Sequence, residues 1–143
     1  MSKGLPPVKY LIDNNLPPKL AHALRELCSY DKSIEVYALS DKFKPSTKDI
    51  DWITELTKDS GWVVISQDRF KKGDAEKEAL RRSGLTVFFL AKQWSQEQYW
   101  SKAHNLVRWW PSIMEQAERM TGGSAFKVKW SHGSKAKFEQ VTL

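Results

Sequence analysis

Two aspartates of this sequence stand where strand-like apolar segments end, and carboxylates in such positions can do chemistry. Asp13 follows the apolar run at 8–12, and Asp68 follows the run at 62–66. In an open sheet of parallel strands, ligands and metals bind at the carboxyl ends of the strands, so we expect these side chains to converge there. Converging carboxylates repel each other, and a bound cation relieves that repulsion.

Further acidic residues extend the same pattern along the chain. Asp49 and Asp51 begin the predicted middle helix, and Asp74 lies just beyond Asp68. Carboxylate oxygens suit Mg²⁺ or Mn²⁺, because hard divalent cations prefer oxygen ligands. Such ions can ionise a water molecule and neutralise the charge on a phosphate, so the pattern indicates hydrolysis of phosphodiester bonds.

Each single aspartate also has a purely structural explanation. An aspartate after a strand often forms a turn or caps a helix. Asp49 can complement the positive end of its own helix. For Asp74 this explanation is stronger than a catalytic role. The joint pattern of acids at several strand and helix ends is what favours a metal centre.

The hydrophobic pattern predicts an α/β domain with a mostly parallel central sheet. Leucines at helical spacing follow the first strand, and the apolar runs at 62–66 and 86–90 are typical of strands covered on both faces. Strand and helix alternate through residue 91, which favours right-handed crossovers. We expect strands at 8–13, 34–39, 62–66 and 86–90, with helices from an Asn15-Leu16-Pro17-Pro18 cap through Cys28, from a cap at 46–49 to near Gly61, and at 74–83, and a polar loop at 42–45.

The C-terminal third has a different pattern. Apolar residues at helical spacing predict a long helix from Ser95 to about Met120, kinked or split at Pro111. Beyond it, the segments at 125–130 and 137–141 alternate apolar and polar residues, which predicts a β-hairpin. We therefore expect a main domain at 8–120 and a C-terminal hairpin appendage at 121–143.

Three motifs resemble the PIN-like nucleases, in particular a small branch in which the first strand is followed by an aspartate, an asparagine and Leu-Pro. The resemblance covers about residues 8–92, and the three motifs occur in the family's order. One departure is Asn14, where many relatives have glutamate. The matching segments are Tyr10-Leu11-Ile12-Asp13-Asn14-Asn15-Leu16-Pro17, Lys48-Asp49-Ile50-Asp51-Trp52 and Val63-Val64-Ile65-Ser66-Gln67-Asp68.

The resemblance implies a three-layer α/β/α fold and a ribonuclease that depends on Mg²⁺ or Mn²⁺, of the kind that acts as the VapC-type toxin of a toxin–antitoxin pair. It also implies a small antitoxin partner. By the same resemblance, the metal-binding and catalytic acids are Asp13, Asp49 and Asp68. Asn15 and Ser66 give polar support, Asp51 competes with Asp49 for one role, and Asp74 is the candidate for a fourth acid. We prefer Asp49 to Asp51 because it lies at the helix cap, beside the sheet edge.

Composition limits the possible partners. The formal net charge is +6, which favours a polyanion such as RNA. Apolar runs stay well short of the roughly twenty residues that span a bilayer, so we expect a cytoplasmic protein without a membrane partner. The lone cysteine, Cys28, excludes an internal disulfide and a thiolate zinc cluster. Candidate RNA-binding cations are Arg69, Lys71 and Lys72 beside Asp68, and Lys42 and Lys44 ahead of Asp49.

The tryptophans are ambiguous. Indole rings can stack on unpaired bases, but helical spacing favours the core or a homodimer contact for most of the seven. Trp109 is the one that we select for a test of base stacking.

Two other functional classes fit parts of the sequence. A receiver-like phosphoacceptor domain also carries acids at strand ends and a lysine after a late strand, as Lys92 is here, but it needs an adjacent acidic pair where this chain has Asp13-Asn14. A PIN-like module that has lost catalysis would bind RNA or protein without cleavage, because a fold does not determine a function.

Overall fold

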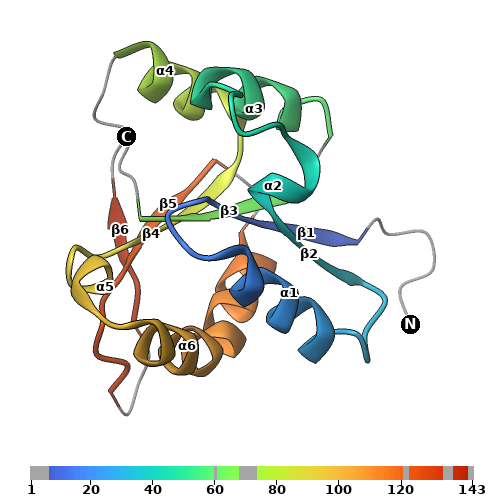
Figure 1. Ribbon diagram of the computed structural model, residues 1–143. Coiled ribbons are helices and arrows are strands. Elements are labelled where there is room, and N and C mark those ends of the chain that lie inside the picture. The colour runs from blue at the N-terminus through green and yellow to red at the C-terminus, as the bar shows by residue number, and fades with distance from the viewer. Residues whose placement is uncertain (1–6, 60, 68–73, 121–122, 134–136, 142–143) are drawn as a thin grey trace.

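The protein is built around one six-stranded sheet in the computed structural model, which describes residues 7–59, 61–67, 74–120, 123–133 and 137–141 (Figure 1). The strand order is β2-β1-β3-β4-β5-β6. Neighbouring strands pair in parallel from β2 to β5, and β6 runs antiparallel to β5. The strands are β1 (Val8–Ile12), β2 (Ile34–Ala38), β3 (Trp62–Ser66), β4 (Thr86–Leu90), β5 (Ala125–Val128) and β6 (Glu139–Val141).

Helices cover both faces of this sheet, which gives the predicted three layers. In Figure 1, α1 and α6 lie on one face, and α3 and α4 lie on the other. None of the helices formed by the described residues is long and apolar enough to cross a membrane. The helices are α1 (Pro18–Leu27), α2 (Leu39–Lys42), α3 (Asp49–Leu56), α4 (Asp74–Ser83), α5 (Gln93–Gln96) and α6 (Tyr99–Arg119).

The alternation of strand side chains explains how one sheet fills two cores. In β1, Tyr10 and Ile12 pack with α1 and α6, whereas Leu11 packs with α3 and α4. In β4, Phe88 faces the first core and Val87 faces the second. Because both faces are covered, the central strands are apolar throughout, as their sequences predicted.

The helix starts differ from the predicted caps. Pro17 precedes α1 and Pro18 is its first residue, without a hydrogen bond from a capping side chain. Proline fixes the backbone for the first turn, which makes a side-chain cap unnecessary. Lys48 precedes α3, again without a capping side chain, so the predicted cap at 46–49 is wrong. The expected strand at 34–39 ends at Ala38. The four-residue helix α2 then takes up residues 39–42, which include the first residue of the loop expected at 42–45.

The long C-terminal helix is continuous through Pro111. It begins at Tyr99, after the separate short helix α5, and not at Ser95. Because one helix runs through Pro111, the expected split is wrong, and a kink there stays a prediction. Pro111 itself lies on the exposed side, while Trp110 and Ile113 anchor the helix in the core. The burial of these two side chains stabilises helix on both sides of the proline.

The predicted hairpin is present and joins the main sheet. Its first strand, β5, pairs in parallel with β4, and Phe126 and Val128 belong to the same core as α1 and α6. Side chains of the preceding helices also hold it, because Trp94 Nε1 donates to the Val128 carbonyl at 3.1 Å and Asn105 Nδ2 donates to the Trp130 carbonyl at 2.7 Å. The segment expected as an appendage thus shares a core with residues 8–120.

Candidate active site

The backbone places Asp13 beside the end of β3. β1 and β3 are neighbours in the middle of the sheet, with Ile12 opposite Ile65. The Asp13 N–H donates to the Ile65 carbonyl at 2.9 Å, which extends the strand pairing by one residue. Asp13 and Ser66 therefore stand next to each other at the carboxyl edge, where parallel sheets bind their ligands.

The Asp13 carboxylate is buried and held by hydrogen bonds. Its residue is 6 % exposed. The Ser66 hydroxyl donates to Oδ2 at 2.8 Å, and the Asn14 N–H donates to Oδ1 at 2.7 Å. Ser66 is fully buried, so its hydroxyl depends on protein partners for its hydrogen bonds. Two donors from different segments fix the orientation of this carboxylate.

Asn15 completes a cluster of oxygen atoms at the same edge. Its Oδ1 lies 3.1 Å from the Ser66 hydroxyl, which also serves Asp13. A hydroxyl has one proton to donate, so Ser66 divides it between the two acceptors. Of the predicted site residues, the structure thus brings together Asp13, Asn15 and Ser66.

The donor set of this cluster fits a hard cation. Carboxylate, amide and hydroxyl oxygens are ligands that Mg²⁺ and Mn²⁺ accept, and each carboxylate oxygen keeps further lone pairs beside its hydrogen bond. In the described ranges, which leave out residues 68–73, no group of three or more His, Cys, Asp or Glu side chains could hold a metal ion. A cation bound by Asp13 would need further ligands, and the predicted one, Asp68, lies outside the described residues.

Several predicted residues lie outside the described part of the chain. These are Asp68 and the cations Arg69, Lys71 and Lys72. Ser66 ends β3 and Gln67 follows it, so the described chain stops one residue before Asp68. The role of Asp68 as a metal ligand stays a prediction.

The predicted acids near the helix starts are Asp49, Asp51 and Asp74, and they lie on two helices. Asp49 is the first residue of α3 and is half-buried. Its Oδ1 accepts a hydrogen bond from Nε1 of the fully buried Trp52 at 3.0 Å, which ties the carboxylate to its own helix. Asp51 is exposed on α3, and Asp74 is the first residue of α4. Their roles in a metal site stay predictions.

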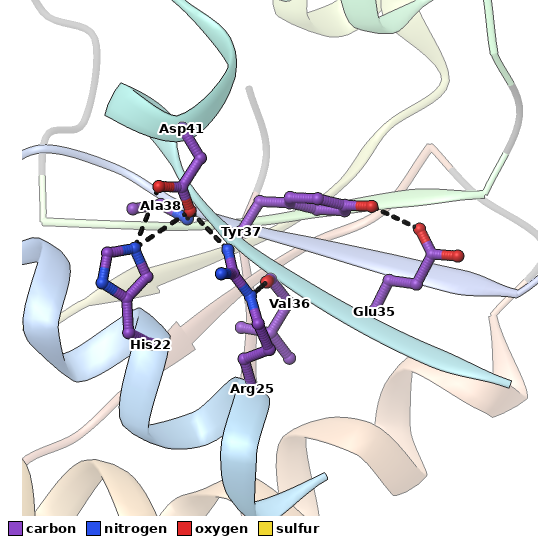
Figure 2. Close-up of polar contacts among 7 residues, drawn as sticks. All are labelled: His22, Arg25, Glu35, Val36, Tyr37, Ala38 and Asp41. Carbon is purple, nitrogen blue, oxygen red and sulfur yellow. Dashed lines mark hydrogen bonds and ion pairs between the residues drawn. The ribbon is translucent and has the colours of Figure 1, made fainter. Parts of the chain in front are cut away.

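An aspartate that the sequence analysis missed forms the centre of a second polar cluster. Asp41 lies in α2, directly after the carboxyl end of β2 (Figure 2). His22 Nε2 lies 2.9 Å from Oδ1, and Arg25 Nη2 and the Ala38 N–H donate to Oδ2 at 2.6 and 2.8 Å. Asp41 follows a predicted strand, as Asp13 does, and this position was a signal that could have identified it. It was missed because its segment was assigned to the connection between the strand and the polar loop.

The Asp41 cluster is built to join elements. Arg25 also donates from Nε to the Val36 carbonyl at 2.9 Å, so one side chain of α1 contacts both the edge strand β2 and α2 (Figure 2). Burial alone would raise the pKa of Asp41. Hydrogen bonds from His22 and Ala38 and the charge of Arg25 outweigh burial and hold the pKa of Asp41 below its usual value.

Three further predicted residues, Lys42, Lys44 and Trp109, differ in their surroundings. The Lys42 ammonium lies 4.5 Å from the centre of the Tyr37 ring and 5.5 Å from that of Trp62, so aromatic faces already bind it. Lys44 is exposed. Trp109 is only 1 % exposed, and its selection for base stacking is wrong because no base can reach the ring.

Comparison with known proteins gives one family. The family described as "PIN like domain" matches residues 8–92, which is more than half of the chain. The match runs from β1 past β4 and includes Asp13, Asn15, Asp49 and Ser66. No curated protein and no solved structure matches the chain.

Proposed function

Since the chain belongs to the PIN-like domain family, whose members are generally nucleases, we propose that it is an endoribonuclease that depends on Mg²⁺ or Mn²⁺. The observation that carries this proposal is the hydrogen-bonded cluster of buried Asp13 and Ser66 with exposed Asn15 at the carboxyl ends of β1 and β3. These residues lie where an α/β sheet binds ligands, and they supply the oxygen donors that such a cation needs.

In this proposal the chain's own residues have separate tasks. Asp13 and Asp68 hold the cation, and Asp49 completes the site or positions a water molecule. Ser66 and the Asn14 N–H keep the Asp13 carboxylate in one orientation. When bound, the cation supplies an ionised water molecule and neutralises charge on the scissile phosphate. A nucleophile from the protein is unnecessary, because water attacks the phosphorus.

The biological setting that we propose is a toxin–antitoxin pair, on the strength of the resemblance to VapC-type toxins. The antitoxin would be a small protein that covers or distorts the acidic edge. A homodimer through the outer face of α6 is the second proposed assembly, supported by the exposed Val107.

The decisive experiment is a cleavage assay on total RNA with the purified protein. We expect cleavage with Mn²⁺, none with chelator, and a loss of roughly a hundredfold or more for Asp13→Asn, because outer-sphere changes alone cost up to that much. Asp59→Asn is the matched control, since Asp59 is exposed and lies at the opposite, amino edge of the sheet. It should cleave as the wild type does.

A non-catalytic binding module is the second candidate. It is favoured by Asn14, which supplies no carboxylate where many members of the family that the chain resembles have glutamate. It predicts RNA or protein binding that survives Asp13→Asn, with no metal-dependent cleavage. Equal activity of the Asp13→Asn variant and the wild type would contradict the nuclease proposal.

A further inference from the structure

An aromatic pair stands exposed at the start of α6. Trp100 is 79 % exposed and Tyr99 is 40 % exposed. Their ring centres lie 5.4 Å apart at an interplanar angle of 83°, so the two rings meet edge to face. Most of the Trp100 surface therefore remains open. An exposed indole contributes little to the stability of the fold, and a binding role gives it a reason.

The fold brings this pair to the same edge of the sheet as Asp13. β4 ends at Leu90 and leads through α5 directly into α6, so the first turn of α6 follows the carboxyl ends of the strands (Figure 1). Along that edge the strands come in the order β1, β3, β4 and β5. Adjacent strands are roughly 4.8 Å apart, which puts the end of β5 roughly 15 Å from the end of β1.

Two lysines follow the strands β4 and β5 at this edge of the sheet. Lys92 follows β4 and Lys129 follows β5, and both are exposed. The strand register brings these segments together, because Leu90 pairs with Val128 and the Ala91 N–H donates to the Val128 carbonyl at 2.9 Å. Glu97 is the acid of the α5–α6 segment, and Gln93 Nε2 donates to it at 3.4 Å. At the ends of β4 and β5 these two lysines outnumber the one carboxylate, whereas Asp13 lies further along the edge at the end of β1.

We propose that Trp100 and Tyr99, with Lys92 and Lys129, form a platform that binds unpaired RNA beside the Asp13 site. This inference rests on the proposed function and names the feature that selects single-stranded substrate. The indole stacks on a base, and the two ammonium groups neutralise phosphates. The end of β5 lies roughly 15 Å along the edge from the end of β1, so an RNA strand of a few nucleotides can extend from Lys129 to the cleaved phosphate. Bases in a duplex are already stacked on each other, so the platform rejects them.

The test is RNA binding measured by fluorescence anisotropy in chelator, where cleavage does not interfere. Trp100→Ala should weaken binding of a short single-stranded oligoribonucleotide about fivefold or more, because stacking is lost, and should leave binding of a duplex unchanged. Trp100→Phe should restore most of the affinity. The double variant Lys92→Ala/Lys129→Ala should weaken binding of both RNAs and reduce the salt dependence.

The chain offers matched controls at the opposite edge. Tyr30 is 78 % exposed and Lys32 is also exposed, and both precede β2 at the amino ends of the strands. Tyr30→Ala and Lys32→Ala should bind RNA as the wild type does. The platform is overturned if Trp100→Ala matches Tyr30→Ala, if it weakens duplex and single strand equally, or if it changes only the oligomeric state.

The same experiments separate the platform from the nuclease. If RNA binding depends on Trp100 but the protein cuts no RNA with Mn²⁺, the proposed nuclease activity is contradicted and the platform is supported. If the protein cleaves RNA with a metal ion but Trp100→Ala does not change RNA binding, the platform is contradicted and the nuclease activity is supported.

Discussion

At the scale of single residues, Ser66 has the most demanding position. It is the last residue of a strand that is otherwise apolar, and its buried hydroxyl contacts side chains from the loop after β1. A polar side chain at such a site costs free energy unless its hydrogen bonds are made. Asp13 and Asn15 make them, and in return Ser66 restrains both.

Ser66→Ala should therefore impair function more than stability. Without the hydroxyl, the Asp13 carboxylate loses an orienting donor, and we expect a loss of roughly 10- to 100-fold in metal-dependent cleavage. The free energy of unfolding should fall by about 1 kcal/mol. Cleavage rates and urea unfolding measure the two effects. Ser29→Ala, which removes an exposed hydroxyl just after the end of α1, is the control, and an equal loss of activity in both variants would contradict the assigned role.

The position after an apolar strand indicated Asp13, and the resemblance to the PIN-like nucleases added Asn15 and Ser66. The selection of Trp109 from the sequence failed. This residue shares a helix face with Leu106 and Ile113 and is buried, whereas Trp100 lies on the opposite side. Which tryptophan is exposed depends on the face that α6 turns to the sheet.

At the scale of elements, Asp41 connects α1, α2 and β2. The pKa of Asp41 is lowered in the folded state, so its contribution to stability is present above the ordinary aspartate pKa and is lost as the pH falls through the lowered value. Its side chain is 24 % exposed, which moderates the effect of the ion pair with Arg25.

We expect Asp41→Asn to lower the free energy of unfolding by about 1 kcal/mol near neutral pH. The difference from the wild type should shrink as the pH is lowered below about 4, where the wild-type carboxylate also becomes protonated. Urea unfolding of both proteins over this pH range is the measurement. A difference that does not depend on pH would exclude an electrostatic role.

Element bounds were predictable where local pattern decides them. The sequence placed β3, β4 and α4 at their observed bounds, because two continuous apolar strands and a polar turn on each side leave little choice. It missed α2, whose four residues are too few for a helical period. It left open whether Pro111 kinks or splits the long helix, because the tertiary burial of Trp110 and Ile113, which holds α6 together, is not local.

At the scale of the whole molecule, the position of β5 was not predictable from its own sequence. Alternating apolar residues predict a strand and a hairpin, but the partner of a strand is a tertiary property. In the structure β5 covers the outer side of β4, and its Phe126 stacks on Phe88 at 5.5 Å between ring centres.

A chain that stops after Met120 should consequently lose cooperative folding. It lacks β5, so the fully buried Phe88 and the edge of β4 become accessible, and we expect aggregation in size-exclusion chromatography and a lost thermal transition. A chain that stops after Gly133 keeps β5 and should remain folded with reduced stability. If the chain that ends at Met120 were monomeric and unfolded cooperatively, the hairpin would be an independent appendage.

The late position of β5 also has a consequence for synthesis. During translation the strands up to β4 emerge first, and β4 has an unpaired side until residues 125–128 follow. A ribosome that stalls in α6 would hold a nascent chain with an open, apolar sheet border, a species that chaperones and proteases recognise. The sheet can therefore be completed only after α6 and β5 have been synthesised. Asp13 and Ser66 are synthesised well before that point.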